Sequence, residues 1–352
     1  MELSILSPTE SEKWDDFIYG HDLSTIYHLS CWSKILSETF SYIPRNLVFK
    51  NDRGIIEAAI PFMLINSRLT GKRLISLPKI PICDPLINQS HLPLMLDYIN
   101  KGITDGEFKY CEIRAHYNEQ VFAGSSFKPY RGHFNHVLDL SRSFDDIWKS
   151  LDRSCVKQRI NKAIKNGIIV REGTNIEDLK IFYSLYNNIT KKHIIPPKPF
   201  RYFSSIWEAF SPSQRLTLLI AEAQGEPAAA SLSFSFRHTM YYEYLGLNYR
   251  LLDLCAGQLL LWELIQRAHA KGHKVLDFGI SEKRNRGLIE YKEKWGTTAN
   301  DVAYIYFPEV QGYKSSIKNL EKREDTERKS LIEYSLNHLN RKIAQIFYKH
   351  FG

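Results

Sequence analysis

The apolar residues of this chain follow two spacings, and each spacing predicts one kind of element. Where apolar residues recur every three or four positions we expect helices that bury one face, and short apolar runs predict strands. In the first half the pattern predicts strands at 3–6, Leu47–Lys50, Ile55–Ile65, Leu74–Leu77, Tyr110–Arg114 and His136–Leu140, and helices at 9–20, Leu29–Phe40 and His91–Asn100.

The second half repeats this order of elements. It predicts helices at Asn175–Lys191, Phe200–Phe210, Gly257–Lys271 and near Leu288, and strands at Leu216–Ala223, Ala228–Phe236, Met240–Leu245, Val275–Phe278 and Val302–Phe307. The two hairpins also share residues at a constant offset, since Leu, Gly and Ala occupy equivalent positions in both: Leu47, Gly54 and Ala58 in the first, Leu218, Gly225 and Ala229 in the second. The repetition indicates an internal duplication.

A basic segment joins the two halves. Residues 145–166 predict two helices or one bent helix that ends at Gly167, and the apolar face comprises Val156, Ile160, Ala163 and Ile164. The opposite face carries Arg153, Lys157, Arg159, Lys162 and Lys165 without an acidic residue. Exposed helix faces usually mix charges, so this stripe favours an anionic partner over a solvated surface.

Composition excludes several classes of protein. The 352 residues, 43% of them apolar, are enough for two domains, and runs such as Leu216–Ala221 are far shorter than the roughly 18 residues of a membrane span. The first residues do not form a secretory signal, so we expect a cytoplasmic protein. Five scattered cysteines argue against disulfides, and no His or Cys spacing predicts a metal site. The net charge of +8 favours phosphates, on a nucleotide, a tRNA or an anionic membrane surface.

The segment Lys274–Gly296 concentrates the candidate chemistry. A short strand ends in Asp277-Phe278-Gly279, a basic loop with Lys283, Arg284 and Arg286 follows, and a helix carries Lys292. Ligands gather where strands of an open α/β sheet end, so Asp277, this basic cluster and Lys292 are expected to line one cleft. The alternative is a capped strand followed by solvated charges.

This segment carries a family resemblance. The pattern DFGxS…GLxxYKxxWG, the preceding helix at Gly257–Gly272 and the basic segment Leu151–Val170 together resemble FemABX-like acyltransferases of the GNAT superfamily, over about residues 1–310. DFG also occurs in protein kinases, but their HRD loop and Gly-rich loop are missing from this chain.

The resemblance implies an α/β fold of two tandem GNAT-like domains, with mixed sheets flanked by helices and a C-terminal helix. The implied limits are 1–142 for the N-terminal domain and 143–310 for the catalytic domain. The latter includes a basic linking helix at 143–166, and a C-terminal helical extension at 311–352 follows it.

The resemblance also implies roles for single residues. Tyr291-Lys292 replaces the family's Phe-Lys pair at the donor end of the active site, where Lys292 would hold a donor phosphate or the developing oxyanion. Asp277 would orient or deprotonate the amine, or cap the loop that follows it. Helix amides at Gly257 and Gln258 are expected to receive an anion or a carbonyl oxygen.

Other substrate-binding candidates are Arg153, Lys157, Arg159, Arg286, Tyr291 and Tyr244. By strand alternation, only one of Glu243 and Tyr244 is expected to face the cleft. The pyrophosphate loop of acetyl-CoA-dependent GNAT enzymes is missing, since the segment Arg250–Gln258 has one glycine. This argues against acetyl-CoA and leaves aminoacyl-tRNA or a carrier-bound acyl group open. The expected donor is aminoacyl-tRNA or an acyl-CoA, and no tightly bound cofactor is expected.

The leading hypothesis is an acyltransferase that attaches an aminoacyl or acyl group to an amine of a cell-envelope or polysaccharide precursor. Its expected partners are a phosphorylated or lipid-linked acceptor and charged tRNA, without DNA and with peripheral contact to a membrane left open. One alternative is an acyl-CoA-dependent N-acyltransferase acting on amino sugars. Another is a tRNA- or nucleic-acid-binding protein without catalysis, which would use the basic stripe.

Overall fold

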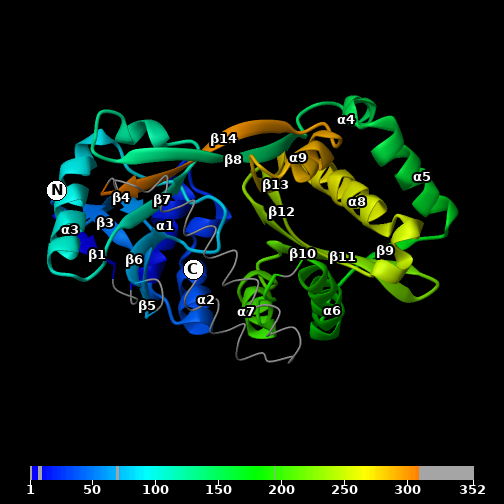
Figure 1. Ribbon diagram of the computed structural model, residues 1–352, viewed down its shortest axis with the longest axis horizontal. Coiled ribbons are helices and arrows are strands. Elements are labelled where there is room, and N and C mark those ends of the chain that lie inside the picture. Colours follow the sequence, from blue (N-terminus) through cyan, green and yellow to red (C-terminus); the bar gives the residue numbers. More distant parts are fainter. Residues whose placement is uncertain (1, 7–9, 69–70, 194, 309–352) are drawn as a thin grey trace. The chain divides into compact units, whose positions relative to one another are not determined.

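The computed structural model describes residues 2–6, 10–68, 71–193 and 195–308 (Figure 1). They form two compact units, 2–132 with 302–308 and 133–301. These limits differ from the predicted domain limits because strand β8 (Lys128–Asp139) begins in the first unit and strand β14 (Thr298–Phe307) ends in it. The predicted helical extension at 311–352 lies outside the described residues.

The described residues of the first unit form two groups of strands and three α-helices. One sheet has the order β1-β3-β4, and five further strands follow the order β2-β5-β6-β7-β14. The bounds are β1 (Glu2–Ile5), β2 (Ile43–Pro44), β3 (Leu47–Lys50), β4 (Ile56–Ile60), β5 (Phe62–Ser67), β6 (Gly71–Ser76), β7 (Cys111–Ala115), α1 (Ser11–Gly20), α2 (Ser30–Phe40) and α3 (Leu92–Thr104). Short turns of other helix types are η2 (Ile26–His28), η3 (Gln89–His91) and η4 (Glu119–Phe122).

The strand predicted at Ile55–Ile65 is two strands. β4 pairs with β3, whereas β5 pairs with β6 and β2. Pro61 lies between them and has no N–H to donate to a ladder, so the chain changes sheets there. The prediction of one continuous strand was therefore wrong.

The second unit contains one mixed run of strands in the order β8-β13-β12-β11-β10-β9. In Figure 1, α6 and α7 lie on one side of these strands and α8 on the other. The bounds are β9 (Ile169–Glu172), β10 (Leu216–Ala223), β11 (Glu226–Phe236), β12 (Thr239–Leu247), β13 (Val275–Glu282), α6 (Ile176–Lys192), α7 (Phe200–Phe210), η6 (Tyr249–Leu254), α8 (Ala256–Ala270) and α9 (Arg286–Glu293). Most helices and strands lie within a few residues of the predicted bounds.

The segment predicted as two helices or one bent helix comprises α4 (Phe144–Ser150), the π-helical turn η5 (Arg153–Lys157) and α5 (Gln158–Lys165), with the extended residue Leu151 after α4. It ends where predicted, with Gly167 at φ +69°. Three of the predicted core residues, Val156, Ile160 and Ala163, are buried. Ile164, however, is 57% exposed, so its assignment to the core was wrong. A helix turns by about 100° per residue, which carries Ile164 away from the line through Ile160 and Ala163.

Candidate active site

Two neighbouring parallel strands of the second unit separate after three paired positions. β12 and β13 pair from Thr239 with Val275 to Tyr241 with Asp277. Directly after these residues each strand is irregular. Within β12 the register against β11 shifts between the partners of Tyr244 and Tyr242, and within β13 the register against β8 shifts between Asp277 and Ile280. Bulges bend strands, and we call the region beyond Tyr241 and Asp277 the fork.

The Asp-Phe-Gly sequence forms the turn on the β13 side of the fork. Gly279 has φ +70°, a conformation that side chains rarely tolerate, and its N–H donates to Asp277 Oδ1 at 2.6 Å. Asn135 of β8 donates from Nδ2 to Asp277 Oδ2 at 3.3 Å. Asp277 Oδ1 therefore stabilises the Gly279 turn and Oδ2 is bound by a side chain of the neighbouring strand, which favours the capping role over that of a base.

Lys292 of α9 is buried at the fork. Asn285 caps this helix by accepting from the Leu288 N–H at 3.2 Å. The Lys292 ammonium is held by the turn, since Nζ donates to Gly279 O and to Ile280 O, at 2.9 Å each. Only 7% of the residue is exposed.

Burial lowers the pKa of Lys292 to about 8, against the opposing effects of Asp277 and Glu243. The side chain is mostly charged at pH 7 and loses its proton within the range where enzymes are usually assayed.

His136 of β8 adds a neutral ring beside this lysine. It is fully buried, and burial together with the charge of Lys292 lowers its pKa to about 4. Its Nδ1 lies 3.5 Å from Thr297 Oγ1, and Thr297 donates to Lys292 O at 3.0 Å. Its Nε2 finds no hydrogen-bond partner among the described residues. His136 is thus a residue near the site that the sequence did not single out.

A second lysine lies in an aromatic setting next to β12. Lys198 donates from Nζ to Tyr244 OH at 2.9 Å, and its Nζ lies 4.7 Å from the ring centroids of both Tyr202 and Tyr244. Burial lowers the pKa of Lys198 to about 8, and Glu243 opposes the shift. The charge of Glu243 therefore acts on both lysines, Lys198 and Lys292.

The bulge in β12 explains why simple alternation could not choose between Glu243 and Tyr244. Tyr244 pairs with Leu232, Tyr242 pairs with the next residue of β11, and Glu243 is the extra residue between them. Tyr244 is 8% exposed and its hydroxyl lies 3.0 Å from Tyr202 OH. Tyr244 thus belongs to the cluster around Lys198, while Glu243 is half-buried and acts toward both lysines.

The other predicted site residues of α9 and α8 differ in exposure. Arg286 is exposed at the first position of α9, and Tyr291 packs against the core with its pKa raised by burial. Gly257 and Gln258 are half-buried at the start of α8, where a Cβ on Gly257 would lie 3.2 Å from Leu247 Cδ2. Of the neighbouring basic residues, Lys283 is paired with Asp301, and Arg284 with Glu282.

The basic stripe lies on η5 and α5, where Arg153 and Arg159 are exposed. Arg159 is close enough to Tyr291 to lower the pKa of its phenol in part, against the larger effect of burial. Lys157 is already engaged, since Nζ donates to Lys149 O at 3.0 Å and lies 5.8 Å from the centroid of a Trp148 ring. Lys157 is therefore less accessible to a ligand than Arg153 and Arg159.

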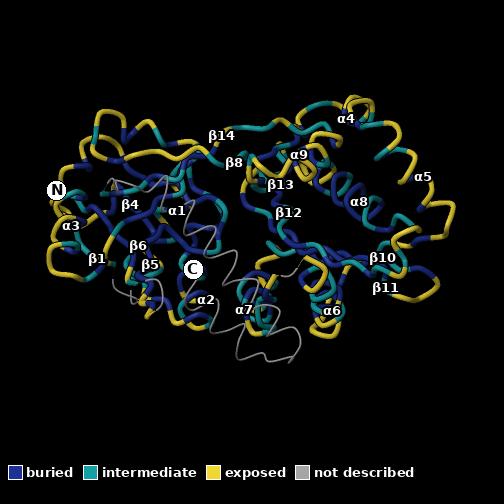
Figure 2. Tube along the Cα trace, in the orientation of Figure 1, coloured by how far each residue is buried: buried dark blue, intermediate teal, exposed yellow. Residues whose placement is uncertain are grey.

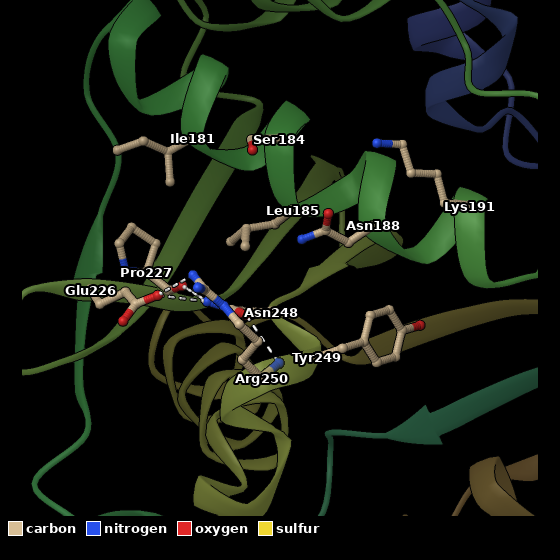
Figure 3. A pocket seen from close by; sticks show the side chains of 10 residues that line it. All are labelled: Ile181, Ser184, Leu185, Asn188, Lys191, Glu226, Pro227, Asn248, Tyr249 and Arg250. Carbon is tan, nitrogen blue, oxygen red and sulfur yellow. Dashed lines mark hydrogen bonds and ion pairs between the residues drawn. The ribbon is translucent and has the colours of Figure 1, made fainter. Parts of the chain in front are cut away.

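Figure 3 shows a pocket of about 650 Å³ on one flank of α6. Its polar groups largely bind one another: Asn248 Nδ2 and Arg250 each donate to Glu226 at 3.0 Å, and Asn188 donates to Leu247 O at 3.2 Å. None of the predicted site residues lines it. Of the residues that the sequence singled out, Asp277 and Lys292 lie together at the fork.

Comparisons with known proteins concern the fold. Residues 152–293 match the family model of the acetyltransferase (GNAT) domain, whereas no curated protein matches the sequence. FemX has a similar fold, with a TM-score of 0.68 at 14% identity over 86% of this chain and 97% of its own.

Two further solved structures are similar. The C-terminal domain of a putative lysylphosphatidylglycerol synthetase from Agrobacterium fabrum has a TM-score of 0.57 at 10% identity, over 90% of this chain and 96% of its own. A tandem GNAT protein from the clavulanic acid biosynthesis pathway has a TM-score of 0.53 at 10% identity, over 87% and 97%. These matches confirm the predicted tandem GNAT-like fold and the resemblance to FemABX-like proteins.

Proposed function

Because the second unit carries a GNAT acyltransferase domain, we propose that the chain transfers an aminoacyl or acyl group to an amine of a cell-envelope or polysaccharide precursor. The fold similarity to FemX and to a putative lysylphosphatidylglycerol synthetase supports this substrate class. The acceptor in this proposal is phosphorylated or linked to a lipid.

The observation that carries the proposal is the buried ammonium of Lys292 at the fork. Attack of an amine on an acyl carbonyl places negative charge on the carbonyl oxygen, and a preorganised cationic donor stabilises that charge most where water is excluded. An ammonium has three N–H groups, and two of them bind Gly279 O and Ile280 O. In this proposal the third N–H donates to the oxyanion or to a donor phosphate.

Carboxylates complete the proposed centre. In this proposal Asp277 holds the turn through its hydrogen bonds with Gly279 and Asn135. Its negative charge also favours the protonated form of Lys292. Glu243, half-buried on the bulge between two lysines, is the better candidate for orienting the incoming amine, because a carboxylate can accept one of its N–H groups. The amine must be neutral when it attacks.

The donor is aminoacyl-tRNA or an acyl-CoA. Its anionic part would approach through Arg159 and Arg286, which are exposed, and through the amides at Gly257 and Gln258. The single glycine between Arg250 and Gln258 favours a donor other than acetyl-CoA, whereas the family match favours a coenzyme A thioester. Both donors therefore belong in the test.

A mass-spectrometric assay separates the alternatives. Charged tRNA and acyl-CoA are offered in parallel with amine acceptors, including phosphorylated sugar and lipid-linked precursors and free amino sugars. The proposal expects a covalent mass increase on a precursor amine, and the donor required identifies the transfer. Transfer only from acyl-CoA to free amino sugars would support the second enzymatic reading. Binding of tRNA without any mass increase would support the non-catalytic reading and contradict the proposal.

A further inference from the structure

Two strongly exposed apolar side chains lie at the end of the basic helix α5. Ile164 is 57% exposed and Ile169, in β9, is 69% exposed. A single exposed isoleucine needs no explanation, but these two are five positions apart across the turn at Gly167. The chain between them spans at most roughly 18 Å, so both lie at the same end of α5.

The chain around them is basic and largely without acidic partners. Residues 153–171 contain six Lys and Arg residues and no Asp or Glu. In the part of the chain that the structure describes, no ion pair or hydrogen bond engages the side chain of Lys162 or Lys165. The first acid that follows, Glu172, is paired with Arg267 at 3.1 Å. The positive charge of this helix is therefore available to a partner.

Cationic and apolar side chains share one surface here. At about 100° per residue, Ile164 lies between the buried side of α5 and Lys165, and Lys162 follows on the exposed side. Figure 2 shows α5 with long exposed stretches, in contrast to the mostly buried or half-buried α8. We call Lys162, Ile164, Lys165 and Ile169 the α5 surface.

We propose that the α5 surface docks on an anionic lipid bilayer. The cations would meet acidic headgroups, and the two isoleucines would enter the boundary between headgroups and acyl chains. Lysine stems lie along apolar surfaces while their ammonium groups stay in the headgroup layer, which allows both contacts at once. A nucleic acid would bind the same cations but would leave both isoleucines in water, because phosphates offer no apolar contact. This docking does not depend on the transfer reaction.

Vesicle sedimentation of the full chain tests the proposal. One set of vesicles contains phosphatidylcholine alone, and the other contains phosphatidylcholine and phosphatidylglycerol in equal parts. The test variants are Ile164→Ser/Ile169→Ser and Lys165→Glu. Their matched controls are Ile55→Ser, which changes a 58% exposed isoleucine of the first unit, and Lys101→Glu, which like Lys165 lies in the last turn of a helix. Thermal unfolding verifies that each variant is folded.

The proposal expects the wild type to sediment with the acidic vesicles and not with the neutral ones. The isoleucine double variant should bind about tenfold more weakly or worse, and Lys165→Glu severalfold more weakly, with the larger effect at low salt. Both controls should match the wild type. Failure of the wild type to bind acidic vesicles would overturn the proposal, and so would binding that is indifferent to the two isoleucines. Gel shifts with tRNA that respond to Lys165→Glu alone, without vesicle binding, would make the surface one for RNA.

Discussion

Both units bury a basic side chain near strand ends, but they treat its charge in opposite ways. In the first unit Arg114 of β7 donates to Glu112 Oε1 and to Ile80 O, each at 2.8 Å. Burial alone would lower the pKa of Arg114, yet Glu112 together with Tyr304 and Tyr306 outweighs burial and raises the pKa. In the second unit Lys292 is bound by two neutral carbonyls, and burial lowers its pKa to about 8.

This difference distinguishes a buried basic residue that stabilises the fold from one that is suited to catalysis. A buried charge that is paired within hydrogen-bonding distance is fixed in one state, and its removal leaves an uncompensated partner. A buried charge whose hydrogen-bond partners are neutral groups, with its pKa moved toward neutral pH, resembles the groups that enzymes use. On this criterion we assign Arg114 to the stability of the first unit, and we propose that Lys292 and Lys198 act in the active site.

The largest expected effect is on stability, in the first unit. Arg114→Met leaves Glu112 buried without its partner and should lower the free energy of unfolding by about 3–5 kcal/mol, measured by urea denaturation. The double variant Arg114→Met/Glu112→Met removes both charges and should recover most of that loss. If the double variant is as unstable as the single one, the unpaired charge of Glu112 is not the cause of the lost stability.

The second prediction concerns the pH dependence of stability in the second unit. The pKa of Lys292 is about 8 in the folded chain and 10.5 in the unfolded chain, so the folded state releases its proton first. The cost of burying the charge is fully present below pH 8 and is relieved as pH rises toward 10.5. The wild type should therefore gain stability relative to Lys292→Met across this range, by up to roughly 3 kcal/mol.

Thermal and urea unfolding at several pH values measure this difference. Lys294→Met is the control, because Lys294 is exposed on the same helix. The difference between wild type and Lys294→Met should stay constant with pH. A constant difference for Lys292→Met as well would show that Lys292 keeps an ordinary pKa and would remove the contrast with Arg114.

A third prediction addresses Glu243, whose charge raises the pKa of both Lys198 and Lys292. If protonated Lys292 is needed, kcat/KM should fall as pH rises through about 8. In Glu243→Gln this falling limb should move to lower pH, by about one unit or less. Glu290→Gln, an exposed change on α9, should leave the limb in place. A pH profile that is identical in Glu243→Gln would separate Glu243 from the site.

The smallest effect is expected on the basic helix. Arg159→Glu should raise KM for the anionic substrate about two- to fivefold with kcat retained, as expected for an exposed charge. Lys157→Glu would also break the hydrogen bond to Lys149 O, so Arg159→Glu alone is the more direct test. The double variant Lys157→Glu/Arg159→Glu serves only for comparison. Steady-state kinetics measure the change, and Lys180→Glu on α6 is the control. An unchanged KM would return Arg159 to an ordinary solvated role.

Much of the fold could be predicted because its helices are periodic and its strands are separated by turn residues. The errors occurred where one residue changed the local geometry. Pro61 divided one predicted strand into two. Ile164 was placed in the core, although its side chain is exposed directly after the buried Ala163. β9 was not predicted, because its Ile169 and Val170 directly follow the helix and carry no alternating pattern.

The site was predictable only in part. Lys292 and Asp277 lie within one local pattern, whereas His136, Lys198 and Glu243 come from a strand, a loop and a bulge that are far apart in sequence. No spacing connects these positions, and a β-bulge cannot be seen in the alternation of the Tyr241–Tyr244 segment. The pairing of β13 with both β12 and β8 brings Glu243 and His136 close enough to Lys292 for their charges to interact.

The most direct measurement is a comparison of Lys292→Met with Lys294→Met in the transfer reaction. If Lys292 stabilises charge that develops in the transition state, kcat and kcat/KM should fall together by about 10²-fold or more, and Lys294→Met should react like the wild type. A higher KM with kcat retained would assign Lys292 to anchoring a donor phosphate. If both parameters are unchanged in Lys292→Met, the buried ammonium at the fork is structural, and the central claim is contradicted.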